Sequence, residues 1–290
     1  MEYELPTIRS TMAGFSNLAK LHEATQALFN DHLDVNFSKC GFFDGNMTAA
    51  LQVILERVAD QGNTVGLIDF PPVLYSFLCK NQFLCQYGHA QIIDSNKTAL
   101  PHKSFHRLDS AEFASYLNEH LPGKGIPTMT EGLGKKFRQS IFEIFQNCVM
   151  HSRSTAGVIV SGQFYPKEHH LDLTIADAGV GIRTNVRQFL RNQISSVDAI
   201  KWAMIEGNTT KTGNQPGGFG LKLLQEFIEL NKGMVQIASR DGFYQFSSGL
   251  KRYETLKADF PGTSINFQIN TSDTKSYGLR SEFSPKNIFQ

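Results

Sequence analysis

Hydrophobic residues in the first third of the chain recur at two spacings, which predict alternating helices and strands. Apolar positions three or four residues apart indicate amphipathic helices, whereas short apolar runs indicate strands. By this criterion the expected helices are residues 15–30, 46–63 and 72–84, and the expected strands are residues 31–43 and 64–70. Because the two kinds of element alternate, we expect an α/β layer with a partly parallel sheet.

The pattern changes between residues 86 and 135, where His, Lys, Pro and Gly interrupt the periodicity around one helical segment, AEFASYLNEHL. We interpret residues 101–124 as a linker region, because Pro and Gly are uncommon inside regular elements. The pattern then predicts a helix at residues 136–150, strands at 157–164 and 171–176, further helices, and closing strands at 234–238 and 263–269. This divides the chain into an N-terminal domain (1–100), the linker, a C-terminal domain (125–272) and a tail (273–290).

Length and composition bound the class of protein. A chain of 290 residues is long enough for two domains that each bury a core. Hydrophobic residues make up 41% of the chain and charged residues 19%, with a formal net charge of +1. These values argue against intrinsic disorder and against a strongly basic surface, so nucleic acid is not an expected partner.

From the sequence we expect neither an export signal nor a membrane span. The first residues, MEYELPTIRS, are acidic and polar, whereas a signal peptide is basic and then apolar. No apolar run approaches the length that spans a bilayer, so we expect a cytoplasmic protein. The cysteines at positions 40, 79, 85 and 148 form no Cys-x-x-Cys pair, and we expect reduced core thiols without a structural metal.

The segment FEIFQNCVMHS, residues 142–152, places three polar side chains one turn apart on an otherwise apolar helix. They are Glu143, Asn147 and His151, and at about 100° per residue they form a stripe beside the apolar face. That face consists of Phe137, Ile141, Ile144, Phe145 and Cys148. Such a stripe either lines a cleft or is an ordinary polar face in solvent.

The strand LDLTIAD, residues 171–177, alternates so that Asp177 shares a face with the apolar residues at every second preceding position. A carboxylate on a buried face needs a hydrogen-bonding partner, because an unpaired charge there is very costly. The exocyclic amine of an adenine is one candidate donor. A structural aspartate that caps the next turn is the alternative.

Glycine-rich segments follow this strand. Gly179 and Gly181 allow backbone conformations or close approaches that a side chain would obstruct. Residues 207–227, GNTTKTGNQPGGFGLKLLQEF, then combine a polar loop with glycines at the start of an amphipathic helix. Exposed N–H groups at a helix N-terminus suit a phosphate chain. Turns also use glycine frequently, so each cluster alone has a structural explanation.

These motifs, in this order, resemble the N, G1 and G2 boxes of the GHKL ATPase superfamily, which includes DNA gyrase, heat-shock chaperones, histidine kinases and mismatch-repair proteins. The motifs are Glu-x-x-x-Asn on a helix, Asp-x-Gly-x-Gly after a strand, and Gly-Gly-x-Gly-Leu at a helix start. The resemblance covers about residues 125–270 and implies a GHKL α/β sandwich, the Bergerat fold. PGT at residues 261–263 is similar to the final strand of the family, whose threonine lies near the adenine.

The resemblance implies ATP and Mg²⁺ as ligands. Asn147 would bind Mg²⁺, and Asp177 would accept a hydrogen bond from the adenine amine. The other implied nucleotide contacts are Gly179, Gly181 and Ile182 at the base, Thr209, Thr210 and Lys211 in a lid at about residues 206–216, Gly217, Gly218, Phe219, Gly220 and Leu221 at the phosphates, and Thr263. Mg²⁺ usually keeps waters and phosphate oxygens as ligands, so one amide oxygen from the protein is sufficient.

Glu143 precedes Asn147 by one turn, where a carboxylate could orient or deprotonate a water that attacks the γ-phosphate. Hydrolysing members of the superfamily have Glu at this position, so the resemblance implies a catalytic role for Glu143. His151 has two interpretations, a phosphate contact or a helix-terminal histidine that hydrogen-bonds a carbonyl, and we prefer the second.

The segment from Phe37 to Asp69 resembles a STAS-type domain, the fold of anti-sigma-factor antagonists, in its strand, Asp-containing turn and helix. In phosphorylatable members a Ser or Thr follows the turn Asp by two residues, whereas Asp44 is followed by Gly45 and Asn46. Thr48 is nearby but out of register. We interpret this half as a docking or regulatory domain without a phosphoswitch. Together the two halves resemble a family of bacterial ATP-binding proteins.

Three functions are compatible with this resemblance. The preferred hypothesis is a slow Mg-dependent ATPase in which ATP closes the lid and alters the surface that a regulatory protein partner recognises. The second is a protein kinase of the anti-sigma or histidine-kinase type, and the third is an ATP-binding scaffold without turnover. A homodimer stays open as a further possibility.

Overall fold

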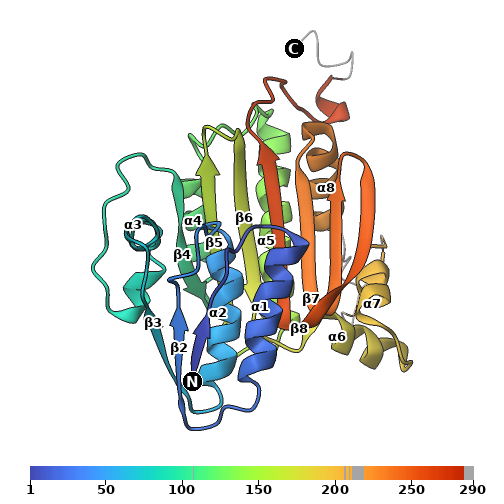
Figure 1. Ribbon diagram of the computed structural model, residues 1–290. Helices are drawn as coiled ribbons and strands as arrows, with labels where there is room; N and C mark the ends of the chain where they lie inside the picture. Colours follow the sequence, from blue (N-terminus) through green and yellow to red (C-terminus); the bar gives the residue numbers. More distant parts are fainter. Residues whose placement is uncertain (107, 206, 209, 211–218, 284–290) are drawn as a thin grey trace.

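The computed structural model describes the chain except residues 107, 206, 209, 211–218 and 284–290, and describes no side chains at 219–222 and 283. It is a mixed α/β structure with a parallel three-stranded sheet and an antiparallel five-stranded sheet. Figure 1 shows helices α1 and α2 against one face of the five-stranded sheet and helices α5 and α8 against the other. The expected α/β class is therefore confirmed.

The first half forms the alternating helices and strands that its hydrophobic pattern predicts. The elements are β1 (Glu2–Glu4), α1 (Met12–Thr25), β2 (His32–Asn36), α2 (Met47–Ala59), β3 (Thr64–Ile68), α3 (Pro72–Lys80) and the 3₁₀ helix η1 (Leu84–Tyr87). Strand β2 pairs in parallel with both β1 and β3, which confirms the predicted parallel pairing. Helix α1 begins after Thr11, whose hydroxyl accepts a hydrogen bond from the backbone N–H of Gly14.

Residues 101–124, interpreted from the sequence as a linker, instead contain regular structure. Strand β4 (Ala99–Phe105) is an edge of the five-stranded sheet and pairs antiparallel with β5, and helix α4 (Ser110–His120) follows it. The register of β4 shifts between Leu100 and Lys103, around Pro101. Proline is tolerated on an edge strand because its missing N–H faces away from the ladder. Because Pro101 interrupts the alternation of hydrophobic and polar residues, the sequence pattern does not indicate this strand.

The second half supplies the rest of the five-stranded sheet, in the order β4-β5-β6-β8-β7. Its elements are α5 (Glu131–His151), β5 (Val158–Tyr165), β6 (His170–Asp177), α6 (Gly181–Leu190), α7 (Ser196–Ala203), α8 (Phe219–Asn231), β7 (Met234–Ser247), β8 (Leu250–Asn270) and the 3₁₀ helix η2 (Arg280–Phe283). Strands β7 and β8 form a hairpin much longer than the predicted closing strands.

Two hydrophobic cores lie on opposite faces of this sheet. One core joins the helices of the first half, including Phe15 and Leu51, to Ile159 and Phe260 of the second half. The other core packs α4, α5 and α8 against the opposite face of the sheet. The two halves of the chain therefore share one core.

Buried polar contacts also join the halves where α2 begins. The Asn46 side-chain amide donates to the Thr174 hydroxyl at 3.0 Å and to the Asn266 amide oxygen at 2.9 Å. The Thr48 hydroxyl lies 2.9 Å from the Ser161 hydroxyl, and Thr48 is fully buried. The turn that leads from Asp44 into α2 is thus packed on the neighbouring sheet.

Among the described residues, no helix is both long enough and apolar enough to cross a membrane.

Candidate functional site

Asp177 is the last residue of β6 and lies on the sheet face that α5 covers. Its side chain is 3% exposed, and the thiol of Cys148 in α5 hydrogen-bonds its carboxyl group. The strand alternation therefore predicted its orientation correctly, because Leu173 and Ile175 belong to the same core as α5. The alternative of a turn cap also applies, since the Gly179 N–H donates to the Asp177 carboxylate at 2.9 Å.

Burial raises the pKa of Asp177 to about 7, because a charged carboxylate is poorly solvated there. The hydrogen bonds from Gly179 and Cys148 act in the opposite direction but do not offset the burial. Burial, together with the nearby Asp177, raises the pKa of the Cys148 thiol well above its usual range. Around neutral pH the carboxyl group is therefore partly protonated, while the thiol keeps its proton.

The backbone after Asp177 runs too close to its neighbours for side chains. A Cβ at Gly179 would overlap the Ser152 carbonyl, which accepts a hydrogen bond from the Val180 N–H at 2.9 Å. Gly181 begins α6 at a φ of +77°, in the region that favours glycine. The two glycines that the sequence singled out are thus required by local geometry.

Strands β7 and β8 complete the surroundings of Asp177. Thr263 of β8 lies directly opposite Asp177 in the sheet register and is itself paired with Ser239 of β7. The Ser239 hydroxyl donates to the Gly262 carbonyl at 2.9 Å, lies 3.1 Å from the Thr263 hydroxyl and accepts from the Ile182 N–H at 2.9 Å. The buried Ser239 hydroxyl therefore joins α6 to β7 and β8 through hydrogen bonds.

The polar stripe of α5 lies beside the core as its spacing predicts. Glu143, Asn147 and His151 are each partly exposed, whereas the five apolar residues of the predicted face are buried. Among the described residues, none hydrogen-bonds to the side chains of Glu143 or Asn147. The carbonyl of His151 accepts a hydrogen bond from the Asn185 side chain at 3.0 Å, which joins the end of α5 to α6.

The predicted lid and phosphate residues are only partly described. Thr209, Lys211, Gly217 and Gly218 lie outside the described residues. Phe219, Gly220 and Leu221 form the first turn of α8, so the helix begins close to the glycine cluster as predicted. Thr210 is partly exposed.

The structure brings together Asp177, Gly179, Gly181, Ile182 and Thr263 around the ends of β6 and β8. Cys148 of α5, the residue after Asn147 in sequence, also contacts Asp177.

Sequence reasoning missed Ser239 and Gly262. Gly262 has a φ of +102°, and a Cβ there would overlap the Asp177 carbonyl. Its place between Pro261 and Thr263 was a usable signal, because Pro-Gly marks an irregular backbone. No local signal pointed to Ser239, whose position depends on strand register.

Comparison with known proteins adds no assignment. No protein-family model matches the chain, and no curated protein matches it. The function is therefore argued from the side chains and backbone described above.

Proposed function

We propose that this protein binds ATP with Mg²⁺, hydrolyses it slowly, and acts as a nucleotide-controlled switch on a regulatory protein partner. In this proposal the five-stranded sheet and its helices are a GHKL-type ATP-binding unit, and the first half is a STAS-like regulatory unit. ATP closure of the lid would change a surface that the partner recognises.

The environment of Asp177 is the observation that carries the proposal. Its buried carboxyl group accepts from only one N–H and one S–H among the described residues. A carboxylate has about four acceptor positions, so it has unused capacity in a place where solvation is poor. The exocyclic amine of adenine is a donor that fits this capacity, and such a contact would favour the charged carboxylate.

The geometry around Asp177 gives further support. Gly179, Gly181 and Gly262 keep side chains away from the ends of β6 and β8, and the Thr263 hydroxyl lies opposite Asp177 in register. A flat base needs this kind of close approach to backbone. A donor and acceptor hydroxyl at Thr263 suits the ring nitrogens of adenine.

The stripe on α5 suits the phosphate end of the ligand. The Asn147 amide oxygen would hold Mg²⁺, which when bound would offset the charge of the phosphate oxygens. Glu143 lies one turn from Asn147, where its carboxylate would orient or deprotonate the attacking water. Both side chains are partly exposed and make no hydrogen bond with the described residues, so both are available for these roles.

Phosphate release from ATP tests the proposal. Purified wild type should release phosphate only with Mg²⁺, whereas Glu143→Gln should bind ATP with unchanged affinity and lose at least about 100-fold in rate, as removal of a general base does. Glu131→Gln is the matched control, because Glu131 is an exposed residue about 18 Å away along the same helix.

ATP binding is measured in parallel with labelled nucleotide. Binding by wild type without release would remove the hydrolase and leave a kinase or scaffold. Failure of wild type to bind ATP would contradict the whole proposal.

A further inference from the structure

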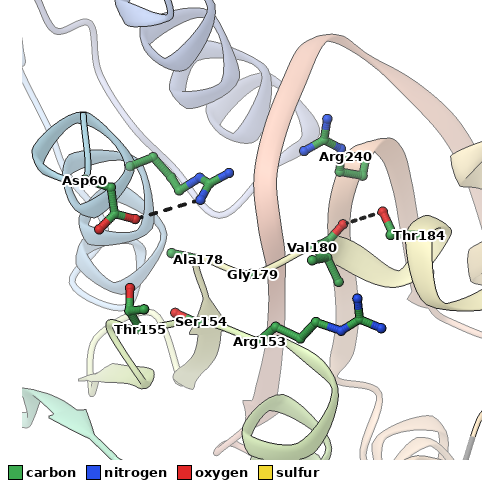
Figure 2. Close-up of a pocket in the computed structure, with 10 residues that line it drawn as sticks. Asp60, Arg153, Ser154, Thr155, Ala178, Gly179, Val180, Thr184 and Arg240 are labelled. Atoms are coloured by element: carbon green, nitrogen blue, oxygen red, sulfur yellow. Dashed lines mark hydrogen bonds and ion pairs between the residues drawn. The ribbon is translucent and has the colours of Figure 1, made fainter. Parts of the chain in front are cut away.

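A cavity of about 470 Å³ lies around residues 178–180, where the end of α2 meets the second half of the chain. This volume is within the range of small-molecule sites. The cavity is lined by Arg57 and Asp60 at the end of α2, Arg153, Ser154 and Thr155 after α5, Ala178, Gly179 and Val180 after β6, Thr184 of α6, and Arg240 of β7. Figure 2 shows Arg153 and Arg240 on opposite sides of the segment that runs from Ala178 to Val180.

The charged side chains of this lining are mainly cationic. Three arginines, Arg57, Arg153 and Arg240, accompany a single carboxylate, Asp60. Arg57 lies 3.8 Å from Asp60, and both side chains are nearly half exposed, at 43% and 45%. An ion pair at that distance and exposure is weak. The Arg57 guanidinium is therefore still available to bind a ligand.

Arg240 keeps donors for a ligand although it has a partner. Its guanidinium contacts the Asp259 carboxylate at 2.6 Å through one terminal nitrogen. A guanidinium has five N–H donors, so a single contact leaves others unused. Arg153 donates to the Gln188 amide oxygen at 2.8 Å and has no carboxylate partner among the described residues.

The pKa of His22 in α1 depends on the electrostatic potential that the cavity arginines produce. Burial is the main cause that lowers the pKa of His22 to about 4, and the charges of Arg240 and Arg57 lower it further. The two arginines therefore act on a common region, although they are distant in sequence. Positive potential in a partly enclosed site attracts anions.

Hydroxyl groups add uncharged donors. The Ser154 hydroxyl is buried and has no hydrogen-bond partner among the described residues. Buried polar groups are usually hydrogen-bonded, so this hydroxyl is an unused donor next to the cavity. The Thr184 hydroxyl donates to the Val180 carbonyl at 2.7 Å and is already occupied.

We propose that this cavity binds a small phosphorylated molecule whose phosphate group contacts Arg57 and Arg240. The planar guanidinium group matches phosphate oxygens with two parallel hydrogen bonds, which are stronger than neutral ones. The proposal is independent of ATP binding, because only Gly179 is common to the cavity and the predicted nucleotide contacts.

Calorimetric titration with inorganic phosphate and with pyrophosphate, at low and constant ionic strength, tests the cavity. Wild type should bind saturably, and Arg57→Gln should weaken binding by about tenfold or more, as expected for loss of a charged hydrogen bond. Arg252→Gln is the matched control, because Arg252 is exposed on β8 and outside the cavity. Arg240→Lys keeps a charge for Asp259 and should weaken binding less than Arg57→Gln.

The imidazole of His22 gives a second measurement. Bound phosphate should raise the His22 pKa in an NMR titration of wild type, because the anion offsets the two arginines. Absence of saturable phosphate binding by wild type, or equal affinity in wild type and Arg57→Gln, would overturn the proposal. A loss of affinity in Arg252→Gln as large as in Arg57→Gln would do the same.

Discussion

Asp177 carries a carboxyl group whose charge is set by its burial under α5. The group titrates near neutral pH because burial raises its pKa from about 3.8 to about 7. The folded protein therefore holds this proton more tightly than the unfolded chain does. A proton bound more tightly by the folded state stabilises that state at low pH, and this contribution is lost as the pH rises through the interval between the two pKa values.

Asp177→Asn should remove this pH dependence, because asparagine resembles the protonated carboxyl group at every pH. Between its two pKa values, the contribution of Asp177 to the free energy of unfolding changes by roughly 1.4 kcal/mol per pH unit. Relative to the Asn variant, the free energy of unfolding of wild type should fall by about 2 kcal/mol between pH 5 and pH 7. Urea unfolding at several pH values measures the difference. Asp31→Asn, at an exposed position, is the matched control.

At the scale of elements, the strand-turn-helix unit from β6 to α6 depends on glycine. Gly179 passes against the Ser152 carbonyl, and that contact fixes the turn to the end of α5. Local pattern predicted β6, the helix α5 and the glycine turn between β6 and α6. It missed β4, because Pro101 and the register shift interrupt the alternation, and pairing with β5 supplies the stability that the local sequence lacks.

Gly179→Ala should destabilise the protein by about 2 kcal/mol or more, because the added Cβ overlaps backbone that cannot move without breaking the turn. Gly134→Ala is the matched control. Gly134 lies within α5, where a Cβ would meet only ordinary contacts at 3.7 Å or more, and alanine favours a helix by about 1 kcal/mol. Urea unfolding should show opposite signs for the two substitutions. Equal effects would mean that the turn relaxes around the new methyl group.

At the scale of the whole molecule, the shared core couples the two halves. Leu51 of α2 is fully buried in the core that also contains Ile159 and Phe260 of the five-stranded sheet. Removal of the first half would expose this sheet face to water, at a cost of about 25 cal/mol for each Å² of apolar surface. The interpretation as a regulatory domain therefore has to include a permanent packing role for α1 and α2.

Leu51→Ala tests this coupling between the halves. The probe is the fluorescence of Trp202 in α7, the only tryptophan in the chain. Truncation of a buried leucine costs about 2 to 5 kcal/mol. If the core is shared, the urea midpoint observed by Trp202 fluorescence should fall together with the midpoint observed by far-UV circular dichroism. Leu250→Ala, at a leucine that is 60% exposed, should shift neither midpoint. A Trp202 midpoint unchanged in Leu51→Ala would indicate two halves that unfold independently.

The sequence alone determined the alternation of helices and strands in the first half, the apolar and polar faces of α5, the buried orientation of Asp177 and the start of α8. These properties follow from local spacing and from the dihedral requirements of single residues. Only the tertiary structure decided that α1 and α2 share a core with the second half, that Ser239 meets Thr263, and that Arg57 and Arg240 line one cavity. The physical reason is that register, burial and charge depend on contacts between residues far apart in sequence, about which a local pattern contains no information.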